Sequence, residues 1–210
     1  MLSVIILSAG LSNRMGNENK LLLSFQGKTI LETTISNILE AGIGEVIVVV
    51  GHEAEKVKAV LKNYPLSIIE NLDYQKGMTT SIQAGIRSTQ NSKPKTHNAG
   101  YMICLSDMVL IEPYEYQLLA QQFLLRADEK AIIQPVFKGK RGNPVIFSSF
   151  YKNAILETED TDGTSRDNRE GCRSVVQAHK KHVKLVEMPT NHVLQDIDFK
   201  EDYERILSIQ

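Results

Sequence analysis

The sequence predicts an α/β fold in which a mostly parallel, doubly wound sheet lies between two layers of helices. Short apolar runs rich in β-branched residues alternate with amphipathic stretches along the 210-residue chain. A β-α-β-α-β order of this kind implies parallel strands joined by helices that cover both faces of the sheet. The length fits one domain, and a hydrophobic share of 42% is enough to form its core.

Five apolar runs are typical of strands that are buried on both faces of a sheet. They are residues 3–7, 46–50, 67–69, 101–105 and 131–136. Between them, apolar side chains recur at helical spacing. These side chains are Leu31, Ile35, Ile38 and Leu39, then Val57, Val60 and Leu61, then Met78, Ile82 and Ile86. Gly42 lies where a helix C-cap is expected, and Gly85 is expected to let the third helix pack closely on a neighbour.

The later part of the chain has a different pattern. Residues 134–137 and 144–147 flank the cationic segment 138–142, which predicts a hairpin with a basic tip. Residues 90–98 are polar and contain a proline, so we expect an exposed connection. Residues 157–170 lack large apolar side chains almost entirely and predict a mobile loop.

Charge and cysteine content exclude several classes of protein. A formal net charge of −1 argues against nucleic acid as the main partner, because binding to a phosphate backbone needs an excess of Lys and Arg. The N-terminal apolar run ends at Ser8 and is too short for a signal peptide or a membrane span. Cys104 and Cys172 do not form a disulfide framework or a metal motif. We therefore expect a cytoplasmic protein that binds neither nucleic acid nor membranes.

The segment after the first predicted strand is the most informative one. Ligands bind at the carboxyl ends of strands in open α/β sheets, and Gly10 and Gly16 there allow close backbone approach. Arg14 and Lys20 can contact several phosphate oxygens. The alternative is a plain strand-to-helix loop with two surface cations. A P-loop is excluded because Leu22 stands where its first glycine belongs, and no dinucleotide-binding glycine motif follows the strand.

Acidic residues in two places predict a metal site. Asp107 follows a buried strand, and Mg²⁺ prefers one or two carboxylates together with substrate phosphates. Asp196 and Asp198 would point to the same side of a short strand, and one of them could share the metal with Asp107. Helix capping is the alternative for Asp198, whereas Asp107 is too far upstream of the helix expected near Glu112.

Three further groups of polar residues have more than one interpretation. Residues 71–81 are rich in hydrogen-bonding groups and could contact a base and ribose, or could simply cap the next helix. His179 and His182 have a spacing of i, i+3 on a predicted helix beside two lysines. A solvated basic face is favoured over a metal site there because no third ligand is evident. The acidic run that begins at Glu159 is not an EF-hand, since Gly163 comes two positions early.

Taken together, these segments resemble the molybdenum-cofactor nucleotidyltransferases, and among them the cytidylyltransferases most. The matching residues are 8–12, 14–16, 19–23, 27–32, 71–81, 106–108, 141–145, 171–173, 196–198 and 201–203. The resemblance implies the nucleotide-diphospho-sugar transferase fold with a small hairpin elaboration. It also implies one domain, with a nucleotide-binding half at residues 1–107 and an acceptor-binding half at residues 108–210.

The resemblance implies a role for each matched residue. Arg14 and Lys20 would hold the triphosphate, and Asp107 would be the principal Mg²⁺ ligand with Asp198 as the favoured second one. The nucleotide would be held by Ala9, Gly10 and Leu11, with Asn71, Gly77 and Ser81 on its base and ribose side. The acceptor would be contacted by Arg141, Gly142, Asn143, Pro144 and Arg173. Guanylyl-transferring relatives carry a second glycine at the place of Ala9, which favours CTP over GTP.

The implied activity is Mg²⁺-dependent transfer of CMP from CTP to the phosphate of molybdopterin or molybdenum cofactor, with release of pyrophosphate. A phosphate nucleophile is already ionised at neutral pH, so no general base is required. A molybdenum hydroxylase or its maturation factor is the implied partner. The alternatives are GTP as donor, a sugar phosphate or isoprenoid-precursor phosphate as acceptor, or a non-catalytic cofactor-delivery protein. The chain departs from the family at Ser106, Val109 and Phe199-Lys200, which bears on acceptor and rate more than on metal binding.

Overall fold

The computed structural model describes residues 2–12, 15, 18–89, 99–125, 129–159 and 171–208. Within these ranges, eight strands form one sheet in the order β10-β7-β9-β6-β1-β4-β5, with β8 paired to β7. The strands are β1 Leu2–Ser8, β4 Gly44–Val50, β5 Ser67–Glu70, β6 Gly100–Leu105, β7 Ile132–Phe137, β8 Lys140–Arg141, β9 Val145–Ser148 and β10 Val183–Glu187. A separate two-stranded sheet is formed by β2 Ser24–Phe25 and β3 Lys28–Thr29.

The central sheet is mostly parallel, as the sequence predicts. Strand β1 pairs in parallel with β4 and β6, β4 with β5, and β7 with β10. The exception in the middle of the sheet is β9, which runs antiparallel between β6 and β7. Leu7 is in register with Leu105, and Ser8 with Val50, so the carboxyl ends of the first strands meet at one edge.

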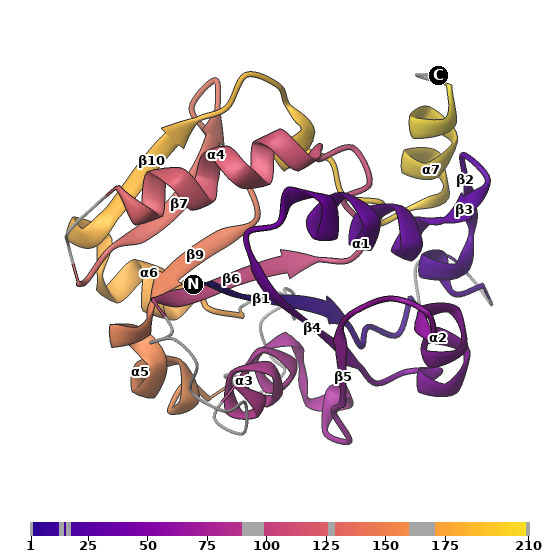
Figure 1. Cartoon of the computed structure of the whole chain (residues 1–210), viewed down its shortest axis with the longest axis horizontal. Coiled ribbons are helices and arrows are strands. Elements are labelled where there is room, and N and C mark those ends of the chain that lie inside the picture. The colour runs from indigo at the N-terminus through magenta and orange to yellow at the C-terminus, as the bar shows by residue number, and fades with distance from the viewer. Residues whose placement is uncertain are drawn as a thin grey trace.

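Helices cover both faces of the sheet and give three layers (Figure 1). One apolar cluster contains residues of α1 Ile30–Ala41, α2 Ala54–Leu61, α4 Pro113–Leu124 and α7 Lys200–Leu207. The other contains residues of α3 Met78–Ser88, α5 Lys152–Leu156 and α6 Arg173–Ala178. Alternate residues of β1 divide between them, with Val4 and Ile6 in the first and Ile5 and Leu7 in the second. The three-layer prediction is therefore confirmed.

Short 3₁₀ helices complete the described secondary structure. They are Lys20–Leu22, Tyr74–Lys76, Ser149–Tyr151, Lys180–His182 and His192–Leu194. None of the described helices is both long and apolar enough to cross a membrane.

The structure confirms the roles expected for two glycines, a helix C-cap at Gly42 and close packing at Gly85. Gly42 adopts a left-handed conformation, with φ 63°, at the end of α1. A Cβ added to Gly85 would lie 2.5 Å from Cγ2 of Ile5, so α3 packs directly on β1 at this position. This close approach places the first turns of α3 beside the carboxyl ends of the central strands.

Three local predictions need correction. The hairpin turn is only Lys138-Gly139, because both adopt positive φ and residues 140–141 already pair with β7. Residues 196–198 are not a strand, since this segment makes a single backbone bond to Asp107 in place of a ladder. Helix α6 ends at Ala178, so His179 and His182 lie at the two ends of the 3₁₀ turn that follows it, with their ring centroids 6.4 Å apart, and not on one α-helix. The predicted connection at 90–98 and most of the loop at 157–170 lie outside the described residues.

Candidate active site

The site begins where β1 and β6 end side by side. The Ser106 hydroxyl donates a 2.6 Å hydrogen bond to the carbonyl of Leu7, which ties the two strand ends together. Asp107 follows immediately and is buried, with 8% of its surface exposed. The position predicted from the sequence, just beyond a buried strand, is therefore the one that the structure shows.

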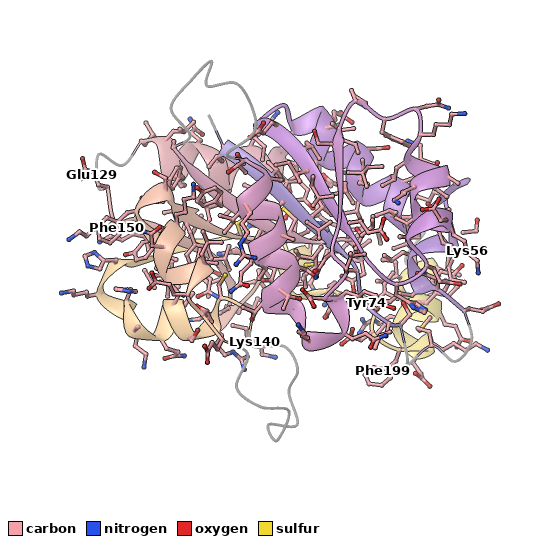
Figure 2. All side chains as sticks on the ribbon, turned by 90° about the horizontal axis from the view of Figure 1, so that it is seen from below. Lys56, Tyr74, Glu129, Lys140, Phe150 and Phe199 are labelled. Atoms are coloured by element: carbon pink, nitrogen blue, oxygen red, sulfur yellow. The ribbon has the colours of Figure 1, made fainter. Side chains whose placement is uncertain are left out.

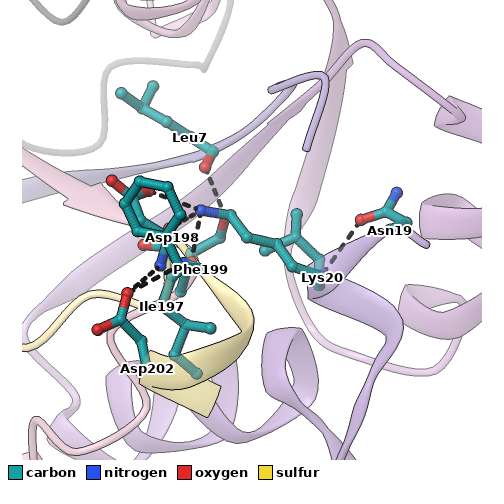
Figure 3. Close-up of polar contacts among 10 residues, drawn as sticks. Leu7, Asn19, Lys20, Ile197, Asp198, Phe199 and Asp202 are labelled. Atoms are coloured by element: carbon teal, nitrogen blue, oxygen red, sulfur yellow. Dashed lines mark hydrogen bonds and ion pairs between the residues drawn. The ribbon is translucent and has the colours of Figure 1, made fainter. Parts of the chain in front are cut away.

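Lys20 joins three distant segments of the chain at this point. It begins a 3₁₀ helix whose N-cap is the side chain of Asn19, which accepts from the backbone N–H of Leu21. Its Nζ lies 2.5 Å from Oδ2 of Asp107 and 3.2 Å from Oδ1 of Asp198. It also donates to the carbonyl of Ile197 at 2.7 Å. Figure 3 shows the lysine extending from its helix to the segment that carries Asp198. We call Lys20, Asp107 and Asp198 the charged cluster.

Helix capping is not the role of Asp198. The N-cap of α7 is Phe199, and the side chain of Asp202 accepts from the backbone N–H groups of Asp198 and Phe199 (Figure 3). The carboxylate of Asp198 is left to contact Lys20. Its role as a metal ligand stays a prediction.

The charges in the cluster reinforce one another. Burial alone would lower the pKa of Lys20, but the carboxylates of Asp107 and Asp198 raise it above its ordinary value. Burial, together with the negative charges of Asp107 and Asp198, raises the pKa of the Asp196 carboxyl. The lysine is therefore a fixed cation at neutral pH, and a lysine ammonium is a group that can bind phosphate oxygens.

The donor set fits a hard divalent cation that also binds substrate. Oδ1 of Asp107 is buried and has no hydrogen-bond partner among the described residues. No group of three His, Cys, Asp or Glu side chains in the described ranges is arranged to hold a metal ion by itself. Mg²⁺ needs no such group, since it is usually held by one or two carboxylates and completes its shell with phosphates and water. Asp107 and Asp198 could supply those carboxylates.

A cavity of about 340 Å³ opens over the charged cluster. Most of the predicted nucleotide and metal residues line it, namely Ala9, Gly10, Leu11, Lys20, Gly77, Ser81, Asp107 and Asp198. Asn71 is not among the lining residues. Its side chain donates to Thr80 and Ser81 and accepts from the N–H of Asp73, so it shapes the loop before α3. Arg14 lies outside the described residues.

A second cavity of about 520 Å³ adjoins the first. Four of the predicted acceptor residues line it: Arg141, Gly142, Asn143 and Arg173. Pro144, which follows Asn143 through a cis peptide bond, is not among the lining residues. Met78, Leu105 and Asp196 line both cavities, so the two spaces meet at these side chains.

In Figure 2, Tyr74, Lys140 and Phe199 lie along the lower edge of the molecule, while Glu129 and Phe150 lie at its left.

Sequence reasoning missed a polar network beside the site. Glu115 of α4 has a fully buried side chain, at 0% exposure, that accepts from Thr190 and contacts His192. Both partners belong to the segment at residues 190–198, which ends at Asp198. A glutamate at an inward-facing position of an amphipathic helix was the available signal, but its partners lie 75 and 77 residues away.

Comparison with known proteins identifies the family. Residues 4–183 match the family described as the MobA-like NTP transferase domain. The chain belongs to this family. It is therefore a nucleotidyltransferase with the nucleotide-diphospho-sugar transferase fold, as the resemblance predicts. The matched range contains most of β1 together with Lys20, Asp107 and Arg173, whereas Asp198 lies beyond it.

Two relatives match nearly the whole of this nucleotidyltransferase chain. Nicotine blue oxidoreductase of Paenarthrobacter nicotinovorans is 23% identical and covers 97% of this chain and 95% of its own. Molybdenum cofactor cytidylyltransferase of Escherichia coli K12 is 26% identical, with coverages of 95% and 92%.

Solved structures share the fold. A nucleotidyl transferase from Methanothermobacter thermautotroptrophicus superposes with a TM-score of 0.80 at 21% identity, covering 100% of this chain and 97% of its own. A Mycobacterium tuberculosis H37Rv protein in complex with manganese gives 0.73 at 18% identity, covering 99% and 98%. CMP:2-keto-3-deoxy-manno-octonic acid synthetase complexed with CTP gives 0.76 at 12% identity, covering 99% and 97%.

Proposed function

We propose that this nucleotidyltransferase joins CMP from CTP to the phosphate of a molybdopterin-type acceptor and releases pyrophosphate. The observation that carries the proposal is the pair of adjoining cavities, of which one contains the charged cluster. Substrates bound in the two spaces would meet at Met78, Leu105 and Asp196. Residues 1–107 would then form the nucleotide-binding half and residues 108–210 the acceptor-binding half.

The charged cluster would neutralise the triphosphate. Lys20, half-buried and cationic, would face the phosphate oxygens, and Arg14 would supply a second cation. Asp107 and Asp198 would hold Mg²⁺, which, when bound, disperses the negative charge that develops on the phosphates. Electrostatic positioning of this kind is the main requirement of phosphoryl transfer, because the nucleophile needs no activation.

The acceptor phosphate would attack the α-phosphorus of the nucleotide. A bond forms between an acceptor phosphate oxygen and the α-phosphorus, and the bond from the α-phosphorus to the pyrophosphate oxygen breaks. Arg141 and Arg173 would orient the acceptor phosphate, and the apolar wall that includes Ile103 and Phe147 would cover a flat ring system. A cavity of about 520 Å³ has the volume of a typical small-molecule site.

CTP and a divalent cation are also supported by what is known of similar proteins. The Escherichia coli relative is named a cytidylyltransferase, one similar structure contains CTP, and another contains manganese. The same relative is named for the molybdenum cofactor, which supports the acceptor. The product would be passed to a molybdenum hydroxylase or its maturation factor.

The test is pyrophosphate release with purified protein, Mg²⁺ and molybdopterin, comparing CTP with GTP, ATP and UTP. We expect release with CTP that depends on both acceptor and metal. Replacing molybdopterin by a sugar phosphate or an isoprenoid-precursor phosphate tests the alternative acceptors. Calorimetry with CTP alone tests whether the protein is instead a non-catalytic carrier. CTP binding without pyrophosphate release in the presence of any of these acceptors would indicate a carrier and overturn the proposal.

A further inference from the structure

A buried carboxylate on α4 is held by three hydrogen bonds outside both cavities. Oε1 of Glu115 accepts from the hydroxyl of Thr190 at 2.7 Å, and Oε2 accepts from the backbone N–H of Glu112 at 2.9 Å. Nδ1 of His192 lies 2.8 Å from the same Oε2. A carboxylate has no hydrogen to donate, so the imidazole must donate Nδ1–H here.

Such a carboxylate is stable in the interior only while its donors are in place. Burial alone would raise the pKa of Glu115, but its bonds to His192, Glu112 and Thr190 lower it below the ordinary value. The bond to Glu115 raises the pKa of His192, and the nearby charge of Glu112 adds to this. Hydrogen bonds to an ionised group are stronger than neutral ones, so the two side chains attach residues 190–198 firmly to α4.

The 190–198 segment in turn contacts both parts of the site. On the acceptor side, the carbonyl of Val193 accepts from the N–H of Asn143 at 3.0 Å. On the nucleotide side, the N–H of Ile197 donates to the carbonyl of Asp107 at 3.2 Å, and the carbonyl of Ile197 accepts from Lys20. The segment therefore bridges α4 and the charged cluster, with Asp198 at its end.

We propose that Glu115 is a positioning residue that fixes residues 190–198, and through them the places of Asp198 and Asn143 at the active site. Glu115 touches neither cavity and acts only through its bonds to Thr190 and His192. Its effect on metal activation rests on the proposed function. Its effect on the order of the segment is independent of that function.

The structural test is amide hydrogen exchange of the full-length protein without substrates. Glu115→Gln keeps the shape but replaces one accepting oxygen by a donor, and Thr190→Val removes one hydroxyl while keeping the volume. We expect the amides of Asn143, Gln195 and Ile197 to exchange about tenfold faster in either variant. Unchanged exchange at these amides in both would overturn the proposal. If Glu115→Gln does not fold, Thr190→Val still decides the question.

Gln117→Leu is the matched control. Gln117 is also on α4, and its side chain donates to the carbonyl of Ala41 in α1 and not to residues 190–198. Its substitution should lower the melting temperature without changing exchange in the segment. If the control accelerates exchange there as much as Thr190→Val does, general loosening of α4 explains the result and the proposal fails.

The kinetic test is the Mg²⁺ concentration that gives half-maximal pyrophosphate release at saturating CTP. We expect it to rise about fivefold in Thr190→Val and to stay unchanged in Gln117→Leu, because a displaced Asp198 weakens the metal site. A wild-type protein that releases no pyrophosphate defeats the proposed function only, since the exchange experiment still decides the role of Glu115. If Thr190→Val is active and its Mg²⁺ dependence is unaltered, the claim that Glu115 fixes the place of Asp198 is overturned.

Discussion

The two cavities are built on different physical principles. The smaller one is lined by a cation, Lys20, and three carboxylates, and these four groups come from three distant parts of the chain. The larger one sets apolar side chains of β6 and β9 against polar groups of the hairpin and α6. Charge is concentrated in the first and spread out in the second. The two cavities thus have largely separate sets of lining side chains, which meet at Met78, Leu105 and Asp196. Under the proposed function, nucleotide chemistry and acceptor selectivity would depend on these separate sets.

The largest effect should come from breaking the charged cluster. Lys20→Ala removes the half-buried cation and leaves Asp107 and Asp198 without it, and Asp107→Ala removes a proposed metal ligand. We expect either variant to lower the rate of pyrophosphate release by about 10²-fold or more. Lys62→Ala, which changes an exposed lysine after α2, should retain full activity. Near-normal turnover in both cluster variants would dismiss this cavity as the reactive one.

Removing a cation from the larger cavity should affect the acceptor alone. Arg173→Ala is expected to raise the KM for the acceptor about tenfold, which is the size of one lost charge-assisted hydrogen bond. The Kd of CTP, measured by calorimetry, should not change. Arg87→Ala, at an exposed position of α3, serves as the control for loss of a positive charge. A parallel loss of CTP affinity in Arg173→Ala would contradict the separation of the two cavities.

A methyl group at Gly85 should disturb both cavities together. The new Cβ would press on Cγ2 of Ile5, and overpacking of this kind costs about 1–3 kcal/mol, partly offset by up to about 1 kcal/mol of helix propensity. Denaturant unfolding measures the loss. Because Met78 at the start of α3 lines both cavities, CTP and acceptor affinities should fall in step. The double variant with Ile5→Ala should be less unstable than the sum of the single variants, and additivity would exclude the predicted clash.

The smallest expected effect is a pH dependence of the stability that the contact between His192 and Glu115 contributes. His192 has its pKa raised above 6.5 in the folded protein, so its contribution to stability is full below 6.5 and is lost as pH rises through the raised value. The stability difference between wild type and His192→Gln should therefore shrink on going from acid to alkaline pH across this window. Urea denaturation at several pH values measures it. A stability difference between the two proteins that grows with pH would contradict stabilisation of a protonated His192 by Glu115.

The parts of the fold that the sequence predicts correctly are those that follow local pattern. Residues 3–7 and 101–105 are continuous apolar runs, and strands buried on both faces require such runs. The helix with Leu31, Ile35 and Ile38 has one apolar stripe and a glycine at its end. In each case, neighbours within one or two turns specify the element.

The site could be predicted only where position in the fold implied proximity. Lys20 and Asp107 follow adjacent strands, so their meeting was foreseeable. The bonds that shape residues 190–198 join positions 75 or more residues apart, and local alternation wrongly suggested a strand at Asp196 and Asp198. The sequence predicts a hairpin tip at residues 138–142, because glycines at 139 and 142 are both compatible with a turn. Pairing of residues 140–141 with β7 limits the turn to Lys138-Gly139. The role of Glu115 was not apparent for the same reason as the shape of the 190–198 segment.

The ion pair between Lys20 and Asp198 closes a span of 178 residues. During synthesis on the ribosome, β1, α1 and β4 can assemble early, since their contacts are local or between neighbouring elements. Lys20 can then contact Asp107 once β6 has emerged, but its contact with Asp198 must follow the synthesis of a further 91 residues. A nascent chain that has emerged only as far as α4 therefore contains Lys20 and Asp107 without Asp198, and the charged cluster can form in full only after the segment before α7 has emerged.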